Sequence, residues 1–235
     1  MLRSPAIKLS LRTFIFTSIF FYSGRKMISL LNVFFVFFAV VFSFYLLFVF
    51  IYPFKQEFKR KEKYDPFISV IIPCKGTSEE FTNFLKSLRK QNYKKIEFIF
   101  ALANSKDQAI KEINRIMKGA KYRIVISKYV AGTSEKNQNI LSALDKIIKI
   151  TEVIVFLDSD GILDGNYIYS LCEPLQDERY MVSSTYRKYE AKSIGGLIIK
   201  YWNLFSLTMK NSLFGKFVWT GGLAFRKRDA EKLEI

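Results

Sequence analysis

The 235-residue sequence contains no histidine and only two cysteines. The absence of histidine excludes Ser-His and Cys-His nucleophilic pairs, histidine metal ligands and histidine acid–base catalysis. Cys74 and Cys172 stand far apart and form no Cys-x-x-Cys pattern, so neither a zinc site nor a disulfide framework is indicated. Carboxylates must therefore hold any metal ion and act as any general base.

Acidic residues are missing from residues 1–54, which contain five Lys/Arg. The formal net charge is +16, and the positive charge of the remaining chain is spread over most segments. Such a surface favours anionic lipids, nucleotide phosphates or nucleic acid. Nucleic acid is not expected as a partner, because the sequence has no zinc-finger spacing, helix-turn-helix pattern or aromatic RNA-binding signature.

Charge of either sign is absent from the 25 residues 28–52, eight of which are phenylalanine. As a helix this stretch would span about 37 Å, enough to cross a hydrocarbon core of roughly 30 Å with some tilt. No small-residue cleavage site follows, so the pattern predicts a retained transmembrane helix. Residues 55–63 hold five Lys/Arg against three in residues 12–26, which predicts a single-pass protein with its large C-terminal part on the cytoplasmic face.

These patterns divide the chain into four parts. Residues 1–26 form a basic, amphipathic N-terminal segment, unless Met27 is the true initiator. Residues 27–53 form the predicted transmembrane helix, and residues 54–66 form a basic linker. Residues 67–235 are long enough to bury the core of one good-sized domain.

Apolar strand candidates recur within that domain at roughly regular spacing, at residues 67–72, 96–102, 122–127 and 153–157. Each gap contains a helical pattern, which is the signature of successive βαβ units in an α/β fold with a parallel sheet. A capping box at Thr77–Glu80 predicts the start of the first helix. A later helical face is predicted from the apolar residues Ile140, Leu141, Leu144, Ile147 and Ile148.

Three further elements are predicted after the fourth strand. A helix is expected over residues 166–176 and a strand over residues 180–185. Residues 194–214 mix apolar, aromatic and a few lysine residues. That composition predicts an amphipathic helix resting on the membrane interface, with ordinary packing as the alternative.

The strand at residues 153–157 delivers Asp158 and Asp160 onto a turn at Gly161. Residues i and i+2 of an extended chain point the same way, so both carboxylates can face one cation. Hard divalent ions bind a few carboxylate oxygens and keep positions open for substrate phosphates. The pair predicts a site for Mg²⁺ or Mn²⁺, and a solvated strand end is the alternative.

Four segments in this order resemble family 2 glycosyltransferases, and in particular their ceramide glucosyltransferase branch. They are Ile68–Gly76, Gly132–Asn139, Val153–Gly161 and Thr220–Lys227. The resemblance covers roughly residues 67–232. It implies a GT-A fold, which is a Rossmann-like parallel or mixed sheet with helices on both faces, and a donor nucleotide lying across the carboxyl ends of the first strands.

The resemblance also implies a function and a site. The function is metal-assisted, inverting transfer of a sugar from a nucleotide-sugar donor, a UDP-sugar, to a lipid or membrane-proximal acceptor. Asn104 or Asp107 would replace an aspartate that the family usually has at the nucleoside, and Lys136 would lie near the phosphates unless it is only an exposed lysine at a helix start. The implied donor residues are Pro73, Lys75, Gly76, Asn104, Asp107, Lys136 and Asp158, the metal ligands are Asp158 and Asp160, and the acceptor-side residues are Thr220, Gly221 and Gly222.

The chain departs from the family beyond the last of these segments. Family members continue to an acidic base and a Gln-x-x-Arg-Trp motif, and Glu231 and Glu234 do not match that base by position. We therefore expect the base beyond Ile235, in a longer chain or a second polypeptide, and donor binding without efficient transfer by these residues alone. One alternative is a catalytically incomplete protein that retains nucleotide binding. Another is a haloacid-dehalogenase-like phosphatase with Asp158 as nucleophile, because residues 156–163 also resemble that motif.

Overall fold

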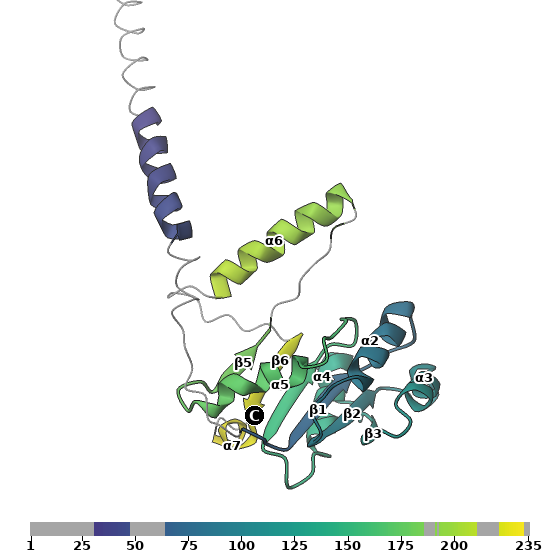
Figure 1. Cartoon of the computed structure of the whole chain (residues 1–235). Helices are drawn as coiled ribbons and strands as arrows, with labels where there is room; N and C mark the ends of the chain where they lie inside the picture. The colour runs from purple at the N-terminus through teal and green to yellow at the C-terminus, as the bar shows by residue number, and fades with distance from the viewer. Residues whose placement is uncertain (1–30, 48–63, 186–190, 192, 211–220, 233–235) are drawn as a thin grey trace, which may run out of the picture. The chain divides into compact units, whose positions relative to one another are not determined.

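Figure 1 shows a computed structural model of the chain, which describes residues 31–47, 64–185, 191, 193–210 and 221–232. The chain divides into two compact units, Met1–Gln56 and Glu57–Ile235. In the first unit residues 31–47 form an α-helix without a charged residue. The ends of the predicted 27–53 helix, the segment 1–26 and most of the 54–66 linker lie outside the described residues. None of the helices in the described ranges combines the length and the apolar character needed to cross a bilayer.

The second unit is built on a six-stranded sheet with the order β3-β2-β1-β4-β6-β5. The strands are β1 (Ile68–Pro73), β2 (Ile96–Leu102), β3 (Tyr122–Ile126), β4 (Val153–Leu157), β5 (Val182–Ser184) and β6 (Gly222–Arg226). β1 pairs in parallel with β2 and β4, and β2 pairs in parallel with β3. β6 runs antiparallel to both β4 and β5. The four strands predicted from the apolar runs are confirmed to within one residue at each end, and the sheet is mixed.

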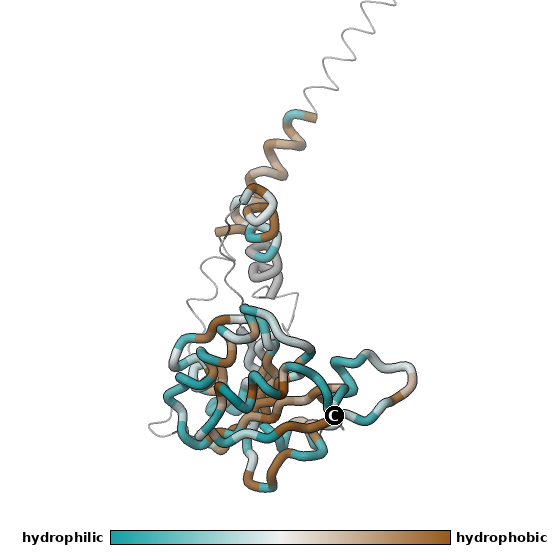
Figure 2. Tube along the Cα trace, turned by 90° about the vertical axis from the view of Figure 1, so that its right-hand side faces the viewer, coloured by the Kyte–Doolittle hydropathy of each residue, from teal (hydrophilic) through white to brown (hydrophobic). Residues whose placement is uncertain are grey.

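Helices cover both faces of this sheet, as the fold prediction required. Alternate residues of a strand point to opposite faces, so Val70 and Ile72 belong to one core cluster and Ile71 to the other. The first cluster packs beneath α2 (Glu79–Arg89), α3 (Ala109–Ile116) and α5 (Tyr167–Cys172), and the second beneath α4 (Glu135–Leu144) and α7 (Lys227–Lys232). In Figure 2 the strands of this unit appear as apolar traces among more polar loops.

Two of the predicted helices begin or end at other residues than expected. The N-cap of α2 is Ser78, whose side chain accepts a hydrogen bond from Phe81 N, so the helix starts one residue later than the Thr77–Glu80 box implied. α4 ends at Leu144. Beyond it, the backbone N–H groups of Lys146 and Ile147 donate to the carbonyl oxygens three residues earlier, as in a 3₁₀ turn. Ile147 and Ile148 therefore lie beyond the helix.

The predicted core role of one α4 residue is wrong. Leu141 is 49% exposed, although it was expected to lie on the buried face with Ile140 and Leu144. Those two residues do pack against the second core cluster, as Ile147 does from the turn beyond the helix. The predicted stripe therefore extends beyond the end of α4, and its second residue, Leu141, is exposed.

The three elements predicted after β4 are all present in shortened form. The helix over residues 166–176 is split into α5 and a 3₁₀ turn, η2 (Glu173–Gln176), because Pro174 has no backbone N–H to continue the α-helix. The strand over residues 180–185 is β5, which is three residues long. The helix over residues 194–214 is α6 (Ile194–Lys210), and the rest of that range lies outside the described residues.

Candidate functional site

A cleft of about 530 Å³ opens where β1 and β4 end side by side. In the sheet, β2 and β3 lie on one side of β1, and β4, which comes later in the chain, lies on the other side. Open α/β sheets bind ligands at such a reversal, outside the carboxyl ends of the strands. The lining residues come from three segments, the β1–α2 loop, the start of α4 and the turn after β4: Pro73, Cys74, Lys75, Ser134, Glu135, Lys136, Asn139, Asp158, Ser159 and Asp160.

The centre of the cleft is an ion pair between α4 and the turn after β4. Lys136 Nζ lies 2.5 Å from Asp158 Oδ1, and both side chains are partly exposed. Ser134 caps α4 by accepting a hydrogen bond from Asn137 N, so Lys136 lies in the first turn of the helix. The amide of Asp158 donates to Gly221 O, at 3.3 Å, which ties this turn to the start of β6. The cleft thus joins a carboxylate, an ammonium group and the amino end of a helix.

The loop after β1 is fixed from the other side by Asp107. Gly76 N donates to both carboxylate oxygens of Asp107 at 3.0 Å, and Ala109 N donates to Asp107 Oδ1 at 2.8 Å. Gly76 has a φ of 64°, a left-handed conformation that favours glycine. Lys75 Nζ lies 3.2 Å from Glu135 Oε2, so the same loop also contacts the start of α4. Asp107 therefore holds the cleft wall in place through the backbone.

Five of the predicted site residues line the cleft, and they are Pro73, Lys75, Lys136, Asp158 and Asp160. Five other predicted residues that the structure describes are not among the lining residues, and they are Gly76, Asn104, Asp107, Gly221 and Gly222.

The two residues expected at the nucleoside, Asn104 and Asp107, both accept hydrogen bonds from backbone N–H groups. Asn104 Oδ1 accepts from Lys106 N at 2.9 Å, a local turn, and neither Asn104 nor Asp107 is among the residues that line the cleft. On the acceptor side, Gly221 contacts the Asp158 turn and Gly222 is buried at the start of β6. Thr220 lies outside the described residues.

Several lining residues were not predicted, and two of them are buried. Burial, assisted by the nearby Asp107 charge, raises the pKa of the Cys74 thiol, whose Sγ contacts Ile72 O at 3.3 Å. Asn139 is 2% exposed, and its Oδ1 has no hydrogen-bond partner. The helical spacing of Lys136 and Asn139 places them on one face of α4, so this spacing was the available signal.

The donor set at the turn fits a divalent cation that shares its ligands with a substrate. Asp158 and Asp160 supply hard carboxylate oxygens, the ligand type that Mg²⁺ and Mn²⁺ prefer. Within the described ranges, no group of three or more His, Cys, Asp or Glu residues could hold a metal ion by itself. A cation held by Asp158 and Asp160 would have positions open for solvent or for a bound molecule such as a diphosphate.

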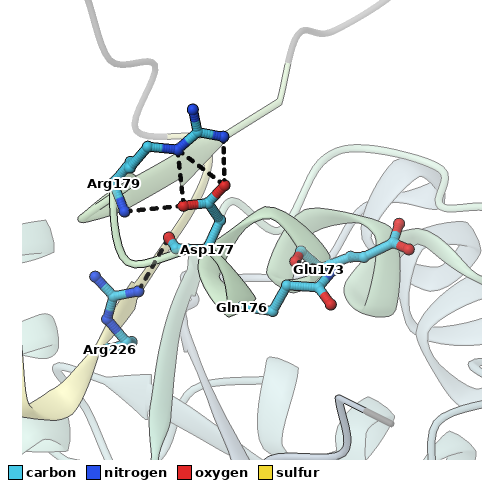
Figure 3. Close-up of polar contacts among 5 residues, drawn as sticks. All are labelled: Glu173, Gln176, Asp177, Arg179 and Arg226. Atoms are coloured by element: carbon cyan, nitrogen blue, oxygen red, sulfur yellow. Dashed lines mark hydrogen bonds and ion pairs between the residues drawn. The ribbon is translucent and has the colours of Figure 1, made fainter. Parts of the chain in front are cut away.

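A second cavity, of about 450 Å³, lies at the opposite end of the central strands, between the end of β6 and the start of β4. Its buried Arg226 donates to Leu175 O at 2.6 Å and to Asp229 Oδ2 at 2.5 Å. Figure 3 shows the neighbouring contacts, in which Arg226 reaches the backbone oxygen of Asp177 and Arg179 pairs with the Asp177 carboxylate. Through these hydrogen bonds Arg226 connects the end of β6 to the segment before β5.

A strand order that reverses beside a carboxylate-lined cleft is typical of α/β proteins that bind a ligand at the carboxyl ends of their strands. The chain belongs to glycosyl transferase family 21, whose family model matches residues 32–223. Ceramide glucosyltransferase 3 of Caenorhabditis elegans is 29% identical over 140 residues, which are 54% of this chain and 30% of that protein. The predicted resemblance to ceramide glucosyltransferases is thereby confirmed. The family that matches is family 21, whereas the resemblance in the sequence was to family 2. Membership in this family excludes the phosphatase alternative.

Two solved structures share the fold. The mannosyltransferase PcManGT from Pyrobaculum calidifontis, in complex with GDP-Man and Mn²⁺, matches with a TM-score of 0.60 at 17% identity, over 83% of this chain and 55% of that chain. S. aureus TarS 1–349, in complex with UDP-GlcNAc, matches with a TM-score of 0.50 at 16% identity, over 72% of this chain and 47% of that chain. The chain thus has the fold of these glycosyltransferases and spans about half the length of each.

Proposed function

We propose that this protein transfers a sugar from a nucleotide-sugar donor, a UDP-sugar, to a lipid acceptor at a membrane. The observation that carries the proposal is the cleft at the ends of β1 and β4, which collects Asp158 and Asp160 with Lys75 and Lys136. Carboxylates that can bind a divalent cation, beside lysine ammonium groups, are the chemistry that a nucleoside diphosphate needs. Family membership supports sugar transfer, and the name of the C. elegans relative favours a ceramide-type acceptor.

Each side chain of the cleft has a distinct part in this proposal. Asp158 and Asp160 hold Mg²⁺ or Mn²⁺, and a cation bound there neutralises charge on the departing nucleoside diphosphate. Lys136 adds positive charge at the same place, together with the amino end of α4. Lys75 provides a second ammonium group on the wall formed by the β1–α2 loop.

The transfer itself would proceed with inversion. The acceptor hydroxyl oxygen attacks the anomeric carbon as the bond from that carbon to the phosphate oxygen breaks, and the hydroxyl proton passes to a carboxylate base. Asp158 and Asp160 are committed to the cation, and Glu135 pairs with Lys75. We therefore assign the base to a carboxylate outside the cleft lining, on this chain or on a partner polypeptide.

We further propose that the protein acts at a membrane, with residues 27–53 as a single-pass anchor and residues 67–235 on the cytoplasmic face. The uncharged stretch 28–52 and the basic linker support this topology. α6 supports a membrane contact, because it contains no acidic residue and exposes large apolar side chains within residues 194–203, where its side chains are described. The exposed side chains are Ile194, Leu197, Ile198, Ile199, Tyr201 and Trp202.

Titration calorimetry of UDP on the full chain in detergent tests the donor site. We expect UDP to bind at least about tenfold more tightly with Mn²⁺ than without it, and Asp158→Ala and Asp160→Ala to remove this gain. Asp145→Asn is the matched control, because Asp145 is an exposed acid at the end of α4 outside the cleft. Equal affinity with and without metal, or unchanged affinity in Asp160→Ala, would contradict the metal site.

A transfer assay separates an active enzyme from a protein that only binds nucleotides. The full chain is incubated with labelled UDP-glucose and either ceramide or a total lipid extract. For the chain alone we expect UDP-glucose to bind with little labelled glycolipid formed, because no base is assigned among the residues that line the cleft. Robust, metal-dependent formation of labelled glycolipid by the chain alone would show that a carboxylate of this chain serves as the base.

A further inference from the structure

Asn139 is a buried polar residue on the wall of the cleft. It lies three residues after Lys136 on α4 and therefore on the same face of the helix. The side chain is 2% exposed, and its Oδ1 has no hydrogen-bond partner. Only one other buried side-chain atom in the described part of the chain, Arg123 Nε, lacks a partner in this way. Asn139 is thus an exception among the described residues, and it occurs at the candidate site.

Among the residues that the structure describes, no polar group pairs with this oxygen. The Cys74 thiol donates to Ile72 O, and the Lys136 ammonium pairs with Asp158. Lys75 pairs with Glu135. Buried side-chain oxygens are nearly always hydrogen-bonded, because leaving one unpaired costs free energy that an apolar residue of the same size would not. Asn139 lines the cleft, so a bound ligand can supply the partner that this buried oxygen lacks.

The missing partner must be a hydrogen-bond donor. The phosphate oxygens of a nucleoside diphosphate are acceptors, so they cannot satisfy Asn139 Oδ1. The hydroxyl groups of the ribose and of the transferred sugar can donate, and both rings are attached directly to the diphosphate. The base is one ring further from the groups that we assign to the diphosphate, which are Lys136, Asp158 and Asp160.

We propose that Asn139 Oδ1 accepts a hydrogen bond from a hydroxyl group of the sugar nucleotide, on the ribose or on the transferred sugar. This inference rests on the proposed function. It makes Asn139 a residue that binds the sugar nucleotide and selects for that hydroxyl group. A site built to pair with a hydroxyl discriminates strongly against the analogue that lacks it, since the buried group is then left unpaired.

The test compares Asn139→Leu with wild type, using the full chain, Mn²⁺ and a series of donors. The series contains UDP-glucose and analogues in which single hydroxyls of the ribose or the glucose are replaced by hydrogen. We expect Asn139→Leu to bind UDP-glucose about tenfold more weakly. One deoxy analogue should bind wild type about tenfold more weakly than UDP-glucose binds wild type. The same analogue and UDP-glucose should bind Asn139→Leu with equal affinity. The position of that deoxy group identifies the ring.

Two further variants control for packing. Asn137→Leu makes the same chemical change at an exposed position of α4, and we expect wild-type affinities. Asn139→Ala is measured alongside, so that the comparison survives if leucine does not fit. The melting temperature of ligand-free Asn139→Leu should equal or exceed that of wild type, because an unpaired polar atom has been removed.

The outcomes separate this inference from the proposed function. If wild type binds no nucleotide sugar, the proposed function fails and this inference fails with it. If wild type binds UDP-glucose and both Asn139 variants bind it equally well, only the inference is overturned, as it would be if an internal water paired with the oxygen. Loss of affinity in the Asn139 variants without coupling to any ribose or glucose hydroxyl would also overturn it.

Discussion

Lys136 Nζ lies 2.5 Å from Asp158 Oδ1. A cation that binds this carboxylate would have to displace the lysine ammonium group. We predict that Lys136→Met binds Mn²⁺ several-fold more tightly than wild type in the absence of nucleotide, because the carboxylate is then free. The same variant should bind UDP several-fold more weakly, since a phosphate-facing charge is lost. The effects stay modest because both side chains are partly exposed and solvent screens the pair.

Calorimetric titrations of Mn²⁺ and of UDP measure the two effects of Lys136→Met separately. Lys146→Met is the matched control, an exposed lysine just after α4 and outside the cleft. Unchanged Mn²⁺ affinity in Lys136→Met would show that this ion pair does not compete with the cation.

Asp107 connects two loops through backbone N–H groups and contributes to stability in consequence. We predict that Asp107→Ala lowers the free energy of unfolding by about 1–2 kcal/mol, because Gly76 N and Ala109 N lose their acceptor. Asp107→Asn should lose less, since one acceptor oxygen remains. Urea denaturation measures both variants.

Asn104→Ala is the comparison that decides between the two residues expected at the nucleoside. Its side chain makes only a local turn with Lys106 N, so we expect a stability change below about 0.5 kcal/mol. A large loss of UDP affinity in Asn104→Ala, with Asp107→Asn unaffected, would show that Asn104 contacts the nucleoside.

The sequence predicted that some residues lie together at one cleft, but it did not predict their hydrogen-bond partners. Asp158, Asp160 and Lys136 were correctly brought to one cleft, because each follows directly from the end of a strand or the start of a helix. The structural task of Asp107 could not be read from its surroundings in the sequence, because its main partner, Gly76 N, is 31 positions away. The unpaired Asn139 oxygen could not be predicted either, since no sequence pattern shows that a side-chain atom lacks a hydrogen-bond partner.

At the scale of elements, β6 depends on a glycine at its first position. A side chain at Gly222 would begin 2.3 Å from both Thr185 Oγ1 and Tyr167 Oη, which hydrogen-bond to each other at 2.6 Å. We predict that Gly222→Ala lowers the free energy of unfolding by about 1–3 kcal/mol, because this polar pair must move apart. Denaturant unfolding provides the measurement.

Gly161→Ala supplies the control for this substitution. A Cβ at Gly161 would meet nothing within 4 Å, so we expect no comparable loss of stability. If Gly222→Ala is as stable as Gly161→Ala, the packing at the start of β6 is looser than the structure indicates.

The elements differed in how well the sequence predicted them. β1, β2 and β4 are apolar runs buried on both faces, and such runs are recognisable without any partner. β6 was not predicted as a strand, because a five-residue segment with a glycine and an arginine carries little strand signal. Its antiparallel direction depends on its pairing with β4 and β5, which is a tertiary property.

At the scale of the whole molecule, buried weak acids set the response to alkaline pH. Burial raises the pKa of Cys74 and of Cys172, and it raises the pKa of Tyr64 and Tyr93. The unfolded chain releases thiol protons above about pH 8.5, whereas the folded protein retains them. The stability contributed by each thiol is therefore complete below that pH and falls by about 1.4 kcal/mol per pH unit above it.

Denaturant unfolding between about pH 7 and about pH 10 measures this decline. We predict that Cys172→Ala, which removes one of the two buried thiols, shows a shallower decline above about pH 8.5 than wild type does. Equal slopes in the two proteins would mean that the thiols do not control alkaline stability.

The two buried cysteines also make a topology experiment clean. Cys74 is 3% and Cys172 is 1% exposed, so neither should react with a thiol reagent in the folded protein. We predict that Lys106→Cys is labelled by a membrane-impermeant maleimide only after cells are permeabilised, whereas Ser23→Cys is labelled from outside intact cells. Labelling of Lys106→Cys in intact cells would overturn the cytoplasmic placement.

The position of β6 in the sheet has a consequence for biosynthesis. β6 is the last strand that the structure describes along the chain, yet it lies between β4 and β5. While the ribosome is still producing the residues before β6, β4 has an apolar, unpaired edge, and β5 has no strand beside it. Open apolar edges invite pairing with other chains. The nascent protein is therefore most prone to aggregation, and most in need of a chaperone, in the interval between the synthesis of β4 and that of β6.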